Sequence, residues 1–155
     1  MKLVIAPHVV SDSHLREILD KVKRPCIRYT EATEENVTQA DCLIIDCYGL
    51  LSSIYRYGEI SYIGGGFGVG IHNVLEAAVY GIPVIFGPNN KKFREAQHLL
   101  EQKGGFEVTG YDDFNRLMDK FLSDEAYLQQ AGKAAGNYVN HNAGALEKIM
   151  KDITL

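Results

Sequence analysis

The sequence has no long apolar run, no basic stripe and no paired cysteines, and these absences exclude several classes of protein. No stretch approaches the roughly 18 apolar residues that a membrane span requires. The opening residues, MKLVIAPH, lead directly into a strand-like run, so we expect no signal peptide. The formal net charge is −4, and its acidic and basic residues are interspersed, which argues against a nucleic-acid-binding module.

The cysteines argue against a redox or metal site. Cys26, Cys42 and Cys47 form no CxxC pair, and their spacing matches no zinc site. An odd number of cysteines inside apolar, strand-like runs fits reduced, buried thiols in a cytosolic protein. No acidic cluster and no HExxH pattern is present, so we expect neither a metal nor a cofactor.

Short apolar runs alternate with helical patterns along the chain. Its 155 residues, 46% hydrophobic and 23% charged, suggest a single domain over residues 1–155 with a substantial core. Alternating strands and helices are typical of a parallel sheet covered on both faces, and right-handed crossovers favour the strand order 3-2-1-4-5-6. We therefore predict a Rossmann-like three-layer α/β domain with a six-stranded parallel sheet, its strands at residues 3–7, 26–29, 42–47, 60–63, 84–86 and 106–109.

The helices are predicted from apolar residues at helical spacing. The first can be capped by Ser11 or Asp12, and Pro25 follows its end. The loop that follows the second strand is polar, with room for one helical turn at most. The later helices are predicted at residues 49–57, 74–80, 91–102, 112–122 and 124–153, the last with a break near residues 140–144.

The most informative stretch is a glycine-rich segment at residues 64–70, GGGFGVG, between a predicted strand and a predicted helix. Glycine allows a sharp turn and lets a ligand approach the backbone, and a helix N-terminus after it can hold an anion. In the predicted strand order, Pro7 and His8 would lie beside Gly64, Gly65 and Gly66, where the order reverses and ligands bind. A flexible turn without a ligand is the alternative. The acidic residue expected of a nicotinamide site is not evident.

Three polar residues, His72, Asn73 and Glu76, lie on nearly one face of the helix predicted after the glycines. Asn73 is a good capping residue, and Glu76 is either a capping-box acid or an acceptor for sugar hydroxyls. A second turn follows at Gly87, Pro88, Asn89 and Asn90, before two lysines. It is either a solvated turn or, because lysines oppose the helix dipole there, a contact for an anionic partner.

The segment YGEISYIGGGFGVGIHNVLEAAVYGIPVIFGPNNKKFREAQHLL resembles the C-terminal domain of 3-deoxy-D-manno-octulosonic acid (Kdo) transferases. The similarity is most specific at residues 64–66, 72–73, 75–76 and 87–88. The resemblance implies one half of a two-domain GT-B glycosyltransferase that adds Kdo to the lipid A precursor of Gram-negative bacteria, with CMP-Kdo as donor. It also implies a membrane-associated N-terminal domain that supplies the acceptor site and the general base, and a position at the cytoplasmic face of the inner membrane.

The resemblance implies that the loops bind the CMP part of the donor. Gly65 and Gly66 would lie against the phosphate or ribose, Asn73 near the phosphate, and Glu76 would take the ribose hydroxyls. The full set of implied substrate-binding residues is Pro7, His8, Gly64, Gly65, Gly66, His72, Asn73, Glu76, Gly87, Pro88 and Asn89, with no catalytic residue in this chain.

The chain departs from the family pattern at three places. Ile71 precedes His72 where many members have glycine, Asn89 and Lys92 stand where many have His and Asn, and no arginine adjoins His8. Two alternatives therefore stay open: a GT-B half that uses another nucleotide sugar, such as a UDP-sugar, and a stand-alone, non-catalytic nucleotide-binding module.

Overall fold

The computed structural model describes residues 1–144 of the 155-residue chain, so the end of the last predicted helix lies outside the described residues. The chain divides into two compact units, Met1–Ile54 and Tyr55–Leu155, and each is described by itself. The expectation of one domain over residues 1–155 stays a prediction.

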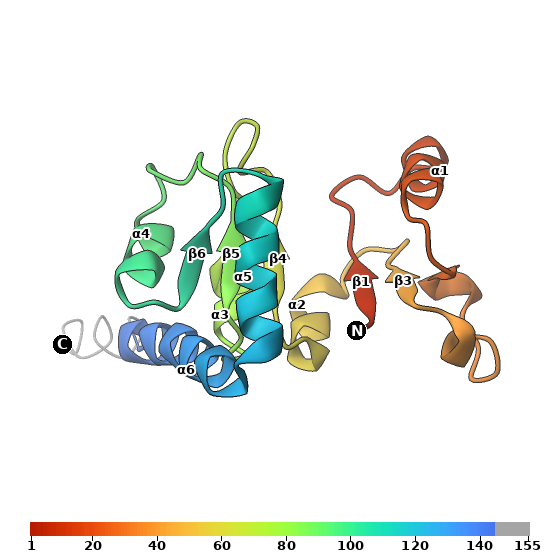
Figure 1. The fold of residues 1–155 in the computed structure, drawn as a ribbon. Coiled ribbons are helices and arrows are strands. Elements are labelled where there is room, and N and C mark those ends of the chain that lie inside the picture. Colours follow the sequence, from red (N-terminus) through yellow and green to blue (C-terminus); the bar gives the residue numbers. More distant parts are fainter. Residues whose placement is uncertain (145–155) are drawn as a thin grey trace, which may run out of the picture. The chain divides into compact units, whose positions relative to one another are not determined.

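The first unit is a three-stranded parallel sheet with one longer helix (Figure 1). Its strands are β1 (Leu3–Ile5), β2 (Cys26–Arg28) and β3 (Cys42–Ile44), in the order β1-β3-β2. Cys42 of the central strand aligns with Leu3 on one side and Cys26 on the other. The remaining elements are α1 (Asp12–Lys21), the 3-10 turns η1 (Tyr29–Glu31) and η2 (Val37–Gln39), and the short α2 (Leu51–Ile54).

Helix α1 forms because its sequence carries both a cap and an apolar stripe. The Ser11 hydroxyl accepts a hydrogen bond from the His14 backbone N–H at 3.3 Å, as the sequence predicts for a capping serine. Leu15 on its inner face packs with Cys42 and Ile44 of β3 in a small buried core.

The second unit is a parallel sheet with helices on both faces. Its strands are β4 (Ser61–Ile63), β5 (Val84–Phe86) and β6 (Gly105–Glu107), in the order β4-β5-β6. The central strand, β5, is fully buried, and Val84 and Phe86 face a core formed with α3 (Leu75–Ala78), α4 (Arg94–Glu101) and α6 (Glu125–Asn142). Ile85 faces the other way, toward Phe121 of α5 (Tyr111–Ser123). Figure 1 shows α5 crossing in front of this sheet.

The three-layer arrangement is thus present in the second unit. A 3-10 turn, η3 (Tyr55–Tyr57), precedes β4. Two helices are shorter than predicted: α3 has four residues where seven were predicted, and the helix predicted at residues 49–57 is the four-residue α2 followed by the 3-10 turn η3. Among the described helices, none is long and apolar enough to cross a membrane.

The predicted single six-stranded sheet is wrong. The described strands form two three-stranded sheets, and only the half-order 4-5-6 matches the prediction. In the first unit the third strand, not the second, lies at the centre. Cys42 and Ile44 are buried to 1% and 0% exposure, whereas Leu3 and Val4 on the edge strand β1 are 42% and 47% exposed. Because β3 lies between β1 and β2, the connection that contains α1 crosses over β3, and Leu15 of α1 packs on it.

Candidate functional site

The turns that follow β4 and β5 form the candidate site, because parallel strands expose their carboxyl ends at one edge of the sheet. After β4, the glycine loop (residues 64–70) closes on itself. The Gly65 carbonyl accepts hydrogen bonds from the N–H groups of Gly68 at 2.9 Å and Gly70 at 3.3 Å. The Gly64 carbonyl accepts from His72 N–H at 3.1 Å. Gly65 has φ +87°, a conformation that favours glycine.

The glycine loop packs directly against the second turn (residues 87–90) that follows β5. A Cβ on Gly66 would lie 2.5 Å from the backbone nitrogen of Gly87, and one on Gly87 would lie 2.7 Å from the carbonyl carbon of Gly66. These two glycines therefore allow two backbone segments to touch, which is a different use of glycine from approach to a ligand. Gly65 is exposed, whereas Gly66 is buried, so Gly65 is the better placed of the two to meet a ligand.

Asn89 joins the same two segments by hydrogen bonds. Its backbone N–H donates to the Gly66 carbonyl at 2.9 Å, and its side-chain Nδ2 donates to the Gly68 carbonyl at 2.6 Å. Asn89 is predicted from the sequence as a ligand-binding residue, and in the structure its amide holds the glycine loop.

Asn73 and Glu76 face each other at the start of α3, as predicted. The Asn73 amide Oδ1 accepts from Leu75 N–H at 3.0 Å, and Nδ2 donates to Glu76 Oε1, also at 3.0 Å. Asn73 therefore orients the carboxylate, but the predicted capping role is wrong in detail: the N-cap of α3 is Val74, which makes no side-chain capping bond, and Asn73 lies one residue before it. Burial, and after it the negative charge of Glu76, raise the pKa of Tyr55, so the carboxylate lies near that phenol.

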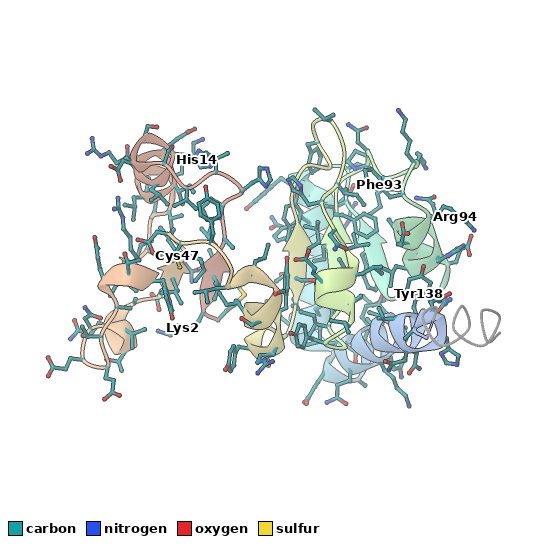
Figure 2. The ribbon with its side chains drawn as sticks, turned by 180° about the vertical axis from the view of Figure 1, so that it is seen from behind. Lys2, His14, Cys47, Phe93, Arg94 and Tyr138 are labelled. Atoms are coloured by element: carbon teal, nitrogen blue, oxygen red, sulfur yellow. The ribbon has the colours of Figure 1, made fainter. Side chains whose placement is uncertain are left out.

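His72 and Asn73 line a hollow of about 240 Å³, which also includes Phe93 and Glu95 at the start of α4. The imidazole of His72 lies against the glycine loop, since a Cβ on Gly65 would be 3.4 Å from His72 Cδ2. Phe93, labelled in Figure 2, also lines the hollow. Its ring lies close to the end of the glycine loop, since a Cβ on Gly70 would be 2.9 Å from it. The hollow is smaller than a typical ligand pocket of roughly 300–1,000 Å³, so it is too small to enclose a whole ligand of that size.

A buried polar network, not predicted from the sequence, lies beside the second turn. Asn90 is fully buried, and its Nδ2 donates to the Gly87 carbonyl at 2.9 Å and to Glu107 Oε2 at 2.6 Å. Its Oδ1 accepts from Gln97 Nε2, also at 2.6 Å. Asparagine beside a turn is common, so no local pattern distinguished Asn90 from its exposed neighbour Asn89.

The structure brings most of the predicted residues together. Those in the second unit gather at the carboxyl ends of β4 and β5: Gly64, Gly65, Gly66, His72, Asn73, Glu76, Gly87, Pro88 and Asn89. Pro7 and His8 follow β1 in the first unit, and their position opposite the glycine loop stays a prediction.

A larger hollow of about 640 Å³ runs along β6 between α4 and α5, but none of the predicted residues lines it. It lies at the side of the sheet rather than at the strand ends where ligands of such sheets bind, so we assign the candidate site to the two turns. Within residues 1–144, no three His, Cys, Asp or Glu side chains are grouped so as to hold a metal ion.

The fold and the position of the two turns define a parallel α/β domain of the Rossmann-like type. The chain is 32% identical over 125 residues to 3-deoxy-D-manno-octulosonic acid transferase of Aquifex aeolicus, an alignment that covers 79% of this chain and 34% of the relative. It is 28% identical over 149 residues to the enzyme of that name from Rickettsia felis, covering 90% of this chain and 31% of the relative. The chain thus spans about a third of the length of these curated relatives.

A solved structure shares the fold. The C-terminal CMP-Kdo binding domain of WaaA from Acinetobacter baumannii superposes with a TM-score of 0.76 at 16% identity, over 88% of this chain and 72% of that one. No family model matches the chain. The resemblance to Kdo transferases that the sequence indicates is confirmed by the similarity to the curated relatives, and the fold is similar to that of the WaaA C-terminal domain.

Proposed function

We propose that this chain is the donor-binding domain of a Kdo transferase, the half of a GT-B glycosyltransferase that holds CMP-Kdo. The observation that carries the proposal is the 32% identity to a Kdo transferase over 125 residues, which includes most of this chain. The open hollow beside His72 and Asn73 supports it, because one half of a two-domain site is expected to present a wall. The acceptor would be the lipid A precursor, at the cytoplasmic face of the inner membrane.

Glu76 is the residue that we assign to the ribose hydroxyls. Its Oε1 accepts one hydrogen bond, from Asn73, whereas a carboxylate has about four acceptor positions. The carboxylate is therefore oriented and still able to accept two hydroxyls. Asn73 acts mainly by orienting Glu76, since its Oδ1 and one amide hydrogen are already used within the chain.

The phosphate is assigned to the glycine loop. Gly65 is exposed at the turn, and His72 lies against it from the side of the hollow. We assign no residue of this chain as the general base. Such a base must lie within about 3 Å of the acceptor hydroxyl, and the acceptor is proposed to bind in another domain. We assign that base to a further domain, and we expect the chain alone to bind the donor without turnover.

Calorimetric titration of the 155-residue chain with CMP, UMP and UDP-GlcNAc tests the donor assignment. We expect CMP to bind most tightly. Tighter binding of UDP-GlcNAc would refute the Kdo assignment in favour of a UDP-sugar enzyme. Binding of none of the three would refute the nucleotide site itself.

Replacing Glu76 tests its role directly. We expect Glu76→Ala to weaken CMP binding by roughly 1–3 kcal/mol, the usual cost of stranding buried polar partners. Glu101→Ala is the matched control, because Glu101 is an exposed glutamate at the end of α4 and lies outside the two turns and α3. Unchanged CMP affinity in Glu76→Ala, with a lower unfolding midpoint, would leave Glu76 as a capping residue only.

A further inference from the structure

A buried amide at the end of β5 connects three elements of the second unit. Asn90 has 0% exposure, and its side chain bonds to the second turn through Gly87, to β6 through Glu107 and to α4 through Gln97. Both amide hydrogens donate and the amide oxygen accepts, so the group is satisfied in one orientation only. A buried polar group with all its partners in place fixes local geometry, and the loss of one partner is costly.

Glu107 sets the orientation of this amide. An ionised carboxylate accepts hydrogen bonds and donates none, so it pairs with Nδ2 of Asn90 and not with Oδ1. A hydrogen bond to a charged group is also stronger than one between neutral groups. Gln97 complements it from the other side, since its Nε2 donates both to Asn90 Oδ1 and, at 3.2 Å, to the Asn90 backbone carbonyl.

The network lies one residue away from the contacts that hold the glycine loop. Asn89 donates to the carbonyls of Gly66 and Gly68, and Gly87 packs against Gly66. Residues 87–90 are therefore fixed by the buried network on one side and carry the glycine loop on the other. A shift of Asn90 moves Asn89 and Gly87, and the loop with them.

We propose that Asn90, with Glu107 and Gln97, is a positioning residue for the donor: it fixes the second turn and, through Asn89, the shape of the glycine loop. This inference rests on the proposed function in that the loop is taken to hold the donor phosphate. Asn90 itself is fully buried, so it acts through the turn and not by contact with the ligand.

The test uses amide chemical shifts of the glycine loop in the free 155-residue chain, together with calorimetric titration with CMP. We expect Asn90→Ala to shift the amides of Gly66 and Gly68 and to weaken CMP binding about tenfold or more, the fold-change that the loss of such a hydrogen bond brings. Gln97→Met is the second variant, should Asn90→Ala fail to fold, because it removes one partner of Asn90 and keeps a side chain of similar length.

A pair of exchanged side chains provides the rescue. Asn90→Asp places two carboxylates together and should act like Asn90→Ala. Adding Glu107→Gln to it restores a donor opposite the new carboxylate, and we expect at least part of the CMP affinity and of the Gly66 and Gly68 shifts to return. The control for general destabilisation is Phe121→Leu, in the core on the opposite face of the sheet, which should lower the unfolding midpoint and leave both readouts unchanged.

The outcomes separate the two proposals. If the wild-type chain binds CMP and the folded Asn90 and Gln97 variants bind it equally well, with unmoved loop amides, the positioning role is refuted and the proposed function stands. If the wild-type chain binds no CMP but the loop amides still shift in the variants, the proposed function is refuted and the positioning of the loop stands.

Discussion

Gly66 offers the sharpest test of how the two turns are assembled. In Gly66→Ala the new Cβ would lie 2.5 Å from the nitrogen and 2.7 Å from the Cα of Gly87. These are backbone atoms, so no side chain can rotate away. Favourable contacts between heavy atoms need roughly 3.5–4.0 Å, so the second turn must retreat by about 1 Å.

A retreat of that size breaks specific contacts. The bond from Asn89 N–H to the Gly66 carbonyl measures 2.9 Å, and about 1 Å more takes it beyond hydrogen-bonding distance. The bond from Asn89 Nδ2 to Gly68 is strained by the same movement. Two hydrogen bonds at about 0.5–1.5 kcal/mol each, with about 1–3 kcal/mol for overpacking, suggest a loss of roughly 2–6 kcal/mol.

Gly68→Ala is the matched control because it lies in the same loop. Its Cβ would lie 3.6 Å from the Gly65 carbonyl oxygen, an ordinary contact, and Gly68 has no positive φ. We expect a change in unfolding free energy of less than about 0.5 kcal/mol. Urea unfolding of both variants, with CMP titration of each, gives the comparison. Equal unfolding midpoints for Gly66→Ala and Gly68→Ala would refute the close packing of the two turns.

Two further predictions concern the first unit. Burial, and after it the neighbouring Cys26, raise the pKa of the Cys42 thiol to about 12 from an ordinary 9.0. The stability that this thiol contributes should therefore be present below pH 9 and be lost as the pH rises toward 12, which urea unfolding midpoints measure. An equal loss of stability over the same pH range in Cys42→Ala would contradict this. Partial burial raises the pKa of Asp46, but hydrogen bonds from the Thr30 hydroxyl and N–H outweigh it and hold that pKa below 3.8. The stability that the Asp46 carboxylate contributes should be present above pH 3.8 and be lost as the pH falls through the lowered pKa. Thr30→Ala should raise the Asp46 pKa in an NMR titration. An unchanged Asp46 pKa in that variant would show that the Thr30 hydroxyl does not hold it down.

The second half of the fold was predictable because its central strand has a distinctive pattern. Val84, Ile85 and Phe86 are all apolar and all buried, as a strand covered on both faces requires. In the first half, the second strand was predicted at the centre, but β2 and β3 are both short runs, and periodicity does not tell a central strand from an edge strand. The difference arises from α1, which packs on Cys42 and Ile44, a long-range contact with no local pattern.

Part of the candidate site was also predictable from local sequence, and part was not. The pairing of Asn73 with Glu76 was predictable, because the two residues are only three positions apart, although Asn73 lies just before the helix and Val74 is its N-cap. The buried network was not, because Asn90 and Glu107 are 17 positions apart and meet only once β5 and β6 pair. Spacing rules reach neighbours within one element, whereas this network depends on the sheet.

The glycines illustrate why composition alone cannot establish a ligand. Gly66 and Gly87 are needed because their backbones touch, and a loop without any ligand would need them equally. Gly65 differs, since it is exposed and in a positive-φ conformation beside the hollow. The case for a nucleotide therefore depends on Gly65 and Glu76, together with the similarity to Kdo transferases, and not on the number of glycines. CMP titration of Glu76→Ala consequently bears on the ligand, whereas Gly66→Ala bears on the scaffold that presents it.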